Sequence, residues 1–432
     1  MNEKIILQVL AEQREFVRKL DVSRLVDRRE EELFEMESDL AQVVVGVRRS
    51  GKSTLCHKVL KKNGTDYAYV NMDDDRLFGA KTEDLNVVLD CVYQLYGSGI
   101  RHLFLDEIQN VDGWHLFVNR LLREGMRVFV TGSNAKLLSG ELATHLTGRF
   151  NEIRLFPFSF PEFCALRGTE LGGLTTKDDA RKKAALRDYL LEGGFPELQR
   201  LKNKRAYVLG LMESIVMKDV RGRHGIRNAQ ALRDMANYLV DNDCQKVNYA
   251  SLAELFGLGS VNTAQKYVSW LKEAFLLSLL PKHSFKSAVR LRNEKSYVVD
   301  TGFLSNRENA LSGENLGWRL ENAVCVELLR RAARSFGSVH YYKPTTQSKE
   351  VDFVVSERGW AKELVQVSYD IESAKTFQRE MSALVAASRN LGCDDLTLVS
   401  ACESRDETVQ GKTIRVRSAV EWLAGHGAAA AH

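Results

Sequence analysis

The 432-residue sequence contains no apolar run long enough to span a bilayer. Its N-terminus lacks the basic start, apolar centre and small-residue cleavage site of a signal peptide, so we expect a cytoplasmic protein without membrane contact. None of the seven cysteines forms a C-x-x-C pair, which argues against a disulfide framework and against a structural zinc site. The net charge of +4 is too small to indicate a nucleic-acid partner by itself.

What is present is an ordinary globular composition in a long chain. Hydrophobic residues make up 44% and charged residues 27% of the sequence, as is typical of folded domains. A chain of 432 residues exceeds the size at which one hydrophobic core usually stops growing. We therefore predict two or three domains, and we find no low-complexity linker and no repeat of fixed period.

Short apolar runs alternate with helical patterns between about residues 40 and 156. The runs cover residues 42–45, 67–71, 102–105 and 128–131, with 151–155 as a candidate fifth. This pattern is typical of buried parallel strands in an α/β sheet. Residues 178 to about 275 read as nearly all helical. A last mixed α/β segment follows, with predicted strands at residues 339–342, 351–355, 363–367 and 396–400.

Residues 46–53, GVRRSGKS, match the P-loop pattern G-x-x-x-x-G-K-[ST]. A predicted strand precedes them and a predicted helix follows, which disfavours a chance glycine-rich turn. In this setting backbone N–H groups wrap phosphates at the helix N-terminus. Lys52 would reach the β- and γ-phosphates of ATP, and Ser53 would hold Mg²⁺. The other predicted nucleotide-binding residues of this segment are Gly46, Val47, Arg48, Arg49, Ser50, Gly51 and Thr54.

Two acids, Asp106 and Glu107, end the apolar strand that begins near residue 101. Asp106 would hold Mg²⁺ directly or through water. Glu107 would act as the general base that polarises the water attacking the γ-phosphate. Solvated acids at a strand end are the alternative, but the position behind a P-loop favours the catalytic interpretation.

The next predicted strand runs into Ser133 and Asn134. A polar side chain at this point could contact the γ-phosphate or the attacking water. An ordinary strand-to-helix turn is the alternative, and the sequence leaves both open.

Five sequence segments, in their order along the chain, resemble an AAA+-type prokaryotic ATPase family that carries a C-terminal domain of unknown function. They are GVRRSGKST, FLDEIQNVDGW, VTGSNAKLLS, LTGRFNEIRLFPFSFPEF and LEGGFPEL. The resemblance implies an α/β P-loop NTPase core with a parallel sheet, a helical lid, a winged helix and an α/β nuclease-like domain. We find no N-K-x-D motif, which agrees with ATP rather than GTP.

The expected boundaries follow from this resemblance. They are an N-terminal helical segment at 1–40, the ATPase core at 41–165, the lid and connector at 166–235, the winged helix at 236–312, the nuclease-like domain at 313–424 and a tail at 425–432.

Arg149 follows a helical stretch rich in small residues. In AAA+ proteins an arginine near this point often reaches the γ-phosphate of a neighbouring subunit, so the resemblance raises the prospect of a homo-oligomer. A salt bridge within one subunit is the alternative. Arg48 and Arg49 could instead supply positive charge from the same chain, and the sequence does not decide among these.

Two helical patterns, at residues 247–257 and 264–275, are separated by a short turn and fit a helix-turn-helix. Strands at 276–280 and 297–300 would form the wing. The basic residues between them are Lys282, Lys286, Arg290, Arg292 and Lys295. A DNA-binding role would direct Asn262, Gln265 and Lys266 toward a groove. A module that contacts only protein is the alternative.

The C-terminal segment resembles the PD-(D/E)xK nuclease fold. Glu321 and Asp352 match the first two acids of that motif, but Gln366 replaces the third acid and Ser368 replaces the lysine. Both changes remove charges that the chemistry needs. Glu363 is in the wrong register, because neighbouring strand residues alternate between faces. We therefore expect an inactive nuclease-like domain that binds nucleic acid or serves as a structural module.

Together these features predict an ATPase that depends on Mg²⁺ and couples its nucleotide state to binding of DNA or another partner. One alternative is an ATP-gated, metal-dependent nuclease, which Gln366 and Ser368 disfavour. Another is a nucleotide-dependent scaffold without turnover, which the intact Lys52, Asp106 and Glu107 disfavour.

Overall fold

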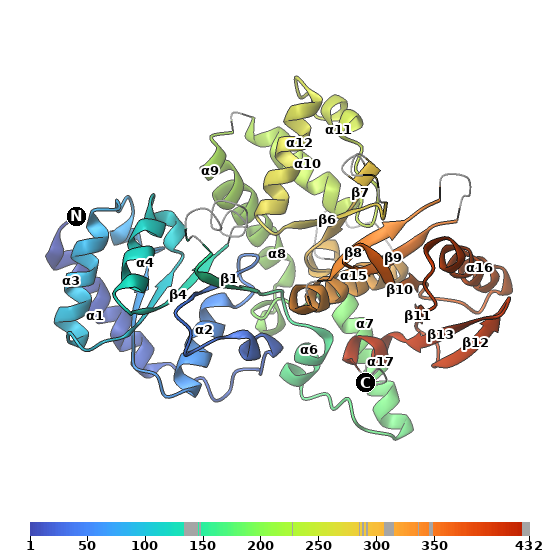
Figure 1. Cartoon of the computed structure of the whole chain (residues 1–432), viewed down its shortest axis with the longest axis horizontal. Helices are drawn as coiled ribbons and strands as arrows, with labels where there is room; N and C mark the ends of the chain where they lie inside the picture. The colour runs from blue at the N-terminus through green and yellow to red at the C-terminus, as the bar shows by residue number, and fades with distance from the viewer. Residues whose placement is uncertain are drawn as a thin grey trace. The chain divides into compact units, whose positions relative to one another are not determined.

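Figure 1 shows the computed structural model of the chain, which comprises two compact units. The first consists of Met1–Leu155 with Glu273–Phe275, and the second of Phe156–Lys272 and the chain from Leu276 onward. The structure describes residues 1–133, 146, 148–226, 228–284, 286, 289–290, 293–305, 315–335, 337–344 and 349–425.

A five-stranded parallel sheet forms the centre of the first unit. Its strands are β1 (Ala41–Val45), β2 (Tyr67–Asn71), β3 (His102–Asp106), β4 (Arg127–Gly132) and β5 (Phe150–Arg154), in the order β2-β3-β4-β1-β5. All five predicted strands are confirmed, and β1 is buried at every residue, as a central parallel strand requires. The order brings the carboxyl ends of β1, β3 and β4 together at one edge.

Helices cover this sheet. They are α1 (Glu3–Lys19), α2 (Lys52–Lys62), α3 (Asp84–Tyr96) and α4 (Trp114–Arg123), with 3-10 turns at Arg29–Leu33, Asp75–Leu77 and Ile108–Asn110. Helix α1 packs beside α3 and β2 (Figure 1). Leu55 and Cys56 of α2 join Val44, Phe104 and Phe129 in one core cluster. The predicted P-loop NTPase-like α/β architecture is therefore confirmed.

The first half of the second unit is mostly helical, as predicted. Its helices are α6 (Phe160–Arg167), α7 (Thr176–Glu192), α8 (Lys204–Ser214), the π-helix η6 (Ile215–Arg221), α9 (Gly222–His224), α10 (Ala229–Asp241), α11 (Tyr249–Leu255), α12 (Val261–Glu273) and α14 (Gly302–Ser305), with a 3-10 turn at Leu198–Arg200. The antiparallel strands β6 (Leu277–Pro281) and β7 (Glu294–Val298) follow α12. These elements lie where the winged helix was predicted, and that name remains a prediction.

The C-terminal part holds a six-stranded mixed sheet in the order β12-β13-β11-β10-β9-β8. The strands are β8 (Ser338–Tyr342), β9 (Val351–Glu357), β10 (Trp360–Val367), β11 (Leu396–Ser400), β12 (Arg405–Val409) and β13 (Lys412–Ser418), and the helices are α15 (Leu316–Ser335), α16 (Ala374–Leu391) and α17 (Ala419–Ala424). The four predicted strands are confirmed. Strands β12 and β13 were missed. The sequence of β12, RDETV, is charged and largely exposed and therefore shows no apolar run. Strand β13, KTIRVRS, has only two apolar residues, Ile414 and Val416, among charged and hydroxyl side chains.

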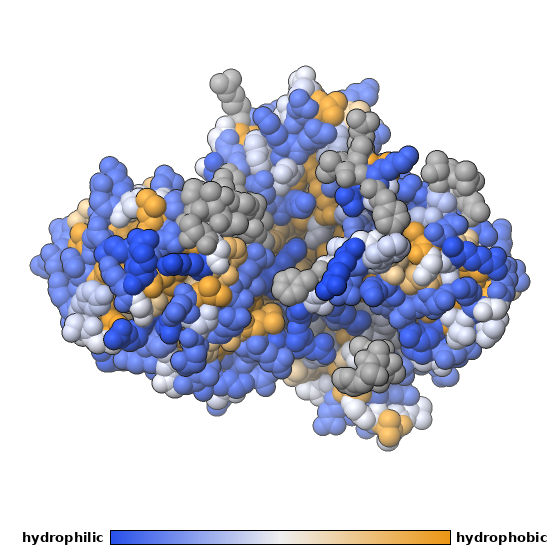
Figure 2. All heavy atoms as spheres, in the orientation of Figure 1, coloured by the Kyte–Doolittle hydropathy of each residue, from blue (hydrophilic) through white to orange (hydrophobic). Residues whose placement is uncertain are grey.

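On the face shown in Figure 2, hydrophilic side chains predominate and apolar groups are scattered among them. No helix within the described ranges combines the length and apolarity needed to cross a membrane. All seven cysteines are free thiols, as predicted. The predicted tail lies outside the described residues beyond Gly425.

Candidate functional site

The segment from Gly46 to Gly51 turns tightly between β1 and α2. A Cβ atom on Gly46 would lie 2.1 Å from the carbonyl oxygen of Leu155, so no side chain fits there. Arg49 and Gly51 have φ values of 69° and 96°, which direct the backbone into the N-terminus of α2. A helix N-terminus offers unpaired N–H groups and a favourable dipole to an anion. Val47 and Ser50 are buried here, whereas Arg49 and Thr54 are exposed.

Lys52 lies inside the curve of this loop and is almost fully buried. Its Nζ donates to the carbonyl oxygens of Gly46, at 3.1 Å, and Val47, at 3.2 Å. The same ammonium lies 3.9 Å from Oε1 of Glu107. A buried cation in this position can pair with phosphate oxygens that enter the loop.

Asp106 ends β3 and is only 4% exposed. Its Oδ1 accepts hydrogen bonds from Ser53 Oγ, at 2.9 Å, and from Thr131 Oγ1, while its Oδ2 accepts one from the Tyr69 hydroxyl, at 2.9 Å. Burial raises the pKa of Asp106, and the Thr131, Ser53 and Tyr69 hydroxyls oppose that rise. The adjacent oxygens of Ser53 and Asp106 are hard donors that suit Mg²⁺.

Glu107 follows in the left-handed region, with φ of 52°. This conformation costs a residue other than glycine on the order of 1 kcal/mol and often marks a functional position. Its backbone N–H donates to Thr131 Oγ1, at 3.1 Å, so Thr131 connects the two acids. Its carboxylate accepts from Gln109 and, at 3.3 Å, from Ser133 Oγ. The P-loop, both acids and Ser133 therefore form one site.

Other predicted residues of this site stay predictions. Asn134 lies outside the described residues. Arg149 is exposed before β5; its amide donates to Leu146 and its carbonyl accepts from the amide of Ala41. Arg48 lies 3.9 Å from Asp73.

The sequence analysis did not identify Tyr69 and Thr131 as hydrogen-bond partners of Asp106. A signal for Tyr69 does exist, because a buried tyrosine on an apolar strand needs a partner for its hydroxyl.

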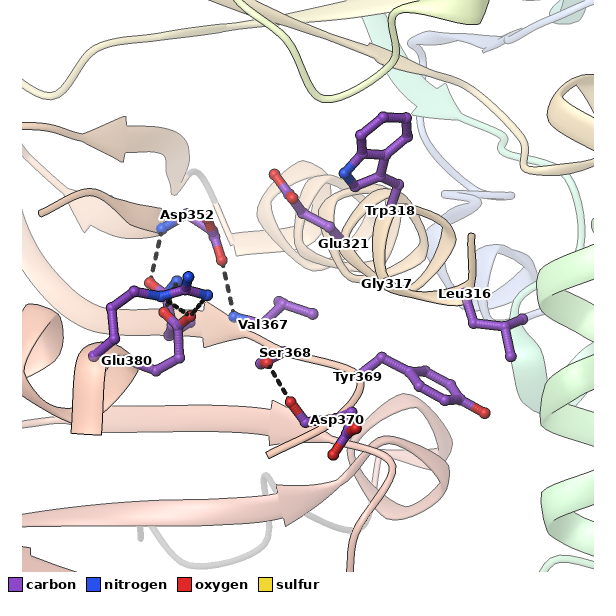
Figure 3. Close-up of a pocket in the computed structure, with 12 residues that line it drawn as sticks. Leu316, Gly317, Trp318, Glu321, Asp352, Val367, Ser368, Tyr369, Asp370 and Glu380 are labelled. Atoms are coloured by element: carbon purple, nitrogen blue, oxygen red, sulfur yellow. Dashed lines mark hydrogen bonds and ion pairs between the residues drawn. The ribbon is translucent and has the colours of Figure 1, made fainter. Parts of the chain in front are cut away.

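In the second unit, Glu321, Asp352 and Gln366 line one cavity of about 620 Å³. Glu321 and Trp318 project from α15, while Asp352 comes from β9 and lies near Glu380 (Figure 3). The complete lining is Leu316, Gly317, Trp318, Glu321, Asp352, Gln366, Val367, Ser368, Tyr369, Asp370, Arg379 and Glu380. The structure thus brings together the three residues identified as a nuclease-like remnant.

Hydrogen bonds within the chain occupy the polar groups of this cavity. Gln366 Nε2 donates to Glu380 Oε2, at 2.8 Å, and Gln366 Oε1 accepts from the Asp352 amide, at 3.2 Å. Asp352 Oδ2 accepts from the Val367 amide, at 2.9 Å. A carboxylate at position 366 could not donate to Glu380. The amide of Gln366 is therefore needed for this hydrogen-bond network, because it both donates and accepts.

Lys295 of β7 provides a buried cation beside the same acids. Its Nζ lies 2.5 Å from Glu350 Oε1 and 3.7 Å from Glu321 Oε1. Burial would lower the pKa of Lys295, but Glu321, Asp352 and Glu350 raise it above its usual range. The Tyr297 hydroxyl also donates to Glu321, at 2.9 Å.

Lys295 was predicted as part of a basic loop, and the structure places it among carboxylates instead. Across the described residues, no group of three or more His, Cys, Asp or Glu side chains is arranged to hold a metal ion.

Comparisons with known families match two segments of this chain. Residues 38–164 match an AAA domain, and residues 183–313 match a domain of unknown function, DUF8612. The second match covers the middle of the chain, whereas the resemblance had placed the domain of unknown function at the C-terminal end. It spans most of the segments predicted as lid and winged helix.

Two relatives align with most of the chain. An uncharacterized protein of Methanocaldococcus jannaschii is 31% identical over 366 residues, which cover 83% of this chain and 80% of the relative. An uncharacterized protein of Haemophilus influenzae is 32% identical over 355 residues, which cover 78% of this chain and 84% of the relative.

Among solved structures, a Walker-type ATPase of Pyrococcus abyssi has a TM-score of 0.43 and 15% identity over 65% of this chain and 95% of that chain. The Orc1 protein of Aeropyrum pernix, solved in complex with DNA, has a TM-score of 0.32 and 13% identity. The match covers 68% of this chain and 96% of that chain. The sequence identity and coverage of the two relatives are decisive: the chain belongs to the same family as the M. jannaschii and H. influenzae proteins, and its N-terminal part is an AAA domain.

Proposed function

We propose that the protein hydrolyses ATP with Mg²⁺ at the site formed by Lys52, Ser53, Asp106 and Glu107. The observation that most strongly supports this proposal is the 2.9 Å hydrogen bond from Ser53 Oγ to Asp106 Oδ1, because these two residues are 53 positions apart in the sequence. Lys52 would bind the β- and γ-phosphates, and Ser53 and Asp106 would hold the metal ion. Bound Mg²⁺ neutralises charge on the phosphate oxygens. Glu107 would orient the attacking water and accept its proton.

Nucleotide binding and hydrolysis, measured separately, test this proposal. Lys52→Ala should abolish binding, because the ammonium that pairs with the phosphates is lost. Glu107→Gln should bind ATP normally and hydrolyse it roughly 10²–10⁴-fold more slowly, the usual contribution of a general base. Normal turnover by Glu107→Gln would remove Glu107 from this role. Wild-type protein that binds ATP but never hydrolyses it would support the scaffold alternative.

We further propose that the second unit contacts nucleic acid through a basic cluster formed by Lys246, Lys282 and Lys286, of which Lys246 and Lys286 are exposed and Lys282 is half-buried. Lys246 pairs with strand β7 through a bridge at Lys295, and Lys282 and Lys286 follow directly after strand β6, so all three residues belong to the segments around the β6–β7 hairpin. The His283 amide donates to the carbonyl of Tyr341, at 2.7 Å, which joins the β6–β7 hairpin to β8. Clustered cations from separate segments suit a phosphate backbone.

The salt dependence of DNA affinity tests the basic cluster. Replacing Lys246, Lys282 and Lys286 by Gln should reduce the slope of log affinity against log salt by up to about three units, because fewer counterions are released. A matched variant with Gln at the exposed positions Lys177, Lys183 and Lys202 carries the same charge change and should retain the wild-type slope. Equal slopes for both variants would exclude this surface.

We also propose that the C-terminal cavity is a structural network without nuclease activity. The support is that Gln366 and Lys295 already satisfy the acids that a metal ion would otherwise neutralise. DNA incubated with Mg²⁺ or Mn²⁺, with or without ATP, should remain uncut. Metal-dependent cutting by wild type that disappears in Asp352→Ala would show an active nuclease instead.

A further inference from the structure

Strand β2 places two buried tyrosines beside the nucleotide site. Tyr67 and Tyr69 are each 5% exposed. The Tyr69 hydroxyl donates to Asp106 Oδ2, at 2.9 Å, on the side of the carboxylate away from Ser53. Both oxygens of Asp106 are therefore held: Oδ1 by Ser53 and Thr131, and Oδ2 by Tyr69.

The ring of Tyr69 is itself held by the helix that follows the P-loop. It packs against His57 with ring centroids 4.5 Å apart and against Phe104 at 5.1 Å. His57 lies four residues after Ser53 in α2, so both project from the same face of that helix. Burial lowers the pKa of His57 to about 4, and the neutral ring accepts or donates a hydrogen bond with the Tyr67 hydroxyl, at 2.8 Å. The same face of α2 therefore carries Ser53, which donates to Oδ1 of Asp106, and His57, which packs against the tyrosine that donates to Oδ2.

The phenol of Tyr69 acts here as a hydrogen-bond donor, because both oxygens of an ionised carboxylate can only accept. A protonated phenol in a fixed ring offers its hydrogen to the carboxylate without competing for a cation. This is the arrangement by which an outer hydrogen bond orients a ligand of a metal ion.

We infer that Tyr69 is a positioning residue for the Mg²⁺–nucleotide complex: its hydroxyl holds Asp106 in the orientation that directs Oδ1 toward Ser53. The inference rests on the proposed ATPase function and deepens it. Without the phenol, Asp106 would lose the donor on Oδ2 and could rotate away from Ser53. Loss of such a partner typically weakens metal affinity by about 10–100-fold.

The test compares Tyr69→Phe with Tyr67→Phe. Each variant removes one buried phenol oxygen from the same strand, but the Tyr67 hydroxyl bonds to His57 and not to Asp106. The first readout is affinity for a fluorescent, non-hydrolysable ATP analogue, measured with Mg²⁺ at several concentrations and with EDTA. The second is the Mg²⁺ concentration that gives half-maximal ATP hydrolysis.

Tyr69→Phe should bind the analogue like wild type in EDTA but need about 10–100-fold more Mg²⁺ to reach the higher affinity and half-maximal hydrolysis. Tyr67→Phe should match wild type in both. Equal Mg²⁺ dependence in the two variants, or weaker binding of Tyr69→Phe already in EDTA, would overturn the inference and leave the proposed function intact. Wild-type affinity that ignores Mg²⁺ would overturn both.

Discussion

At the residue scale, the two acid clusters of this chain differ in what neutralises them. Asp106 receives hydroxyl donors from Ser53, Tyr69 and Thr131, which orient it beside a phosphate-binding loop without adding a positive charge. Glu321 instead faces the ammonium of Lys295, and Glu380 receives the amide of Gln366. Hydroxyl donors orient a carboxylate without cancelling its charge, whereas an ammonium cancels it. The first arrangement suits a metal ligand and the second suits a permanent structural contact.

This difference predicts that Gln366→Glu destabilises the second unit. The new carboxylate would face Glu380 without a donor, at a cost of about 1–3 kcal/mol, the range for leaving a buried polar group unsatisfied. The free energy of unfolding, measured with denaturant at neutral pH, reports the loss. The penalty should shrink near pH 4, where carboxylates become protonated. Gln378→Glu adds the same charge at an exposed site on α16 and should change stability little; equal stability of the two variants would contradict the argument.

At the scale of elements, strand β7 connects several parts of the second unit. Its Lys295 and Tyr297 bond to Glu321 of α15, and its Val298 amide donates to Asp243 Oδ1, at 2.8 Å, beyond the end of α10. Three residues of this strand therefore contact helix α15 and the segment that follows α10.

Asp243 gives this element a pH dependence. Burial raises the pKa of Asp243 to about 8 from its ordinary value of 3.8. The folded state then binds a proton that the unfolded state releases, so stability falls as pH rises from about 4 to 8, by at most about 1.4 kcal/mol per pH unit. Asp243→Asn keeps an acceptor for Val298 and should flatten the profile of unfolding free energy over this window. An unchanged slope in the variant would assign the pH dependence to other groups.

At the scale of the whole molecule, the role of Arg149 determines whether one chain completes its own nucleotide site. Arg149 is exposed, as a residue that acts on a neighbouring subunit must be. If it acts in that way, Arg149→Ala should lower turnover by about 10³-fold or more, with nucleotide affinity unchanged. Specific activity of wild type should also rise with protein concentration. Arg123→Ala, at another exposed position of the same unit, is the matched control. Specific activity that stays flat on dilution would place the role of Arg149 within one subunit.

The sequence by itself determined the P-loop and the five strands of the first unit. A P-loop is one contiguous motif between a strand and a helix, so local pattern is enough to recognise it. Buried parallel strands are short apolar runs, which a single sequence displays directly. Exposed strands such as β12 do not show this pattern, because their residues face solvent on most sides.

Only the tertiary structure decided which side chains surround each acid. Tyr69 and Asp106 are 37 residues apart, and Thr131 and Asp106 are 25 apart, yet both pairs are hydrogen-bonded. Lys295 meets Glu321 because β7 packs against α15, although the sequence suggested a basic loop exposed to a partner. A local pattern carries no record of sheet order or helix packing. Contacts between distant segments depend on how the helices and strands of each unit pack together. The residues that orient the acids of both clusters come from such contacts.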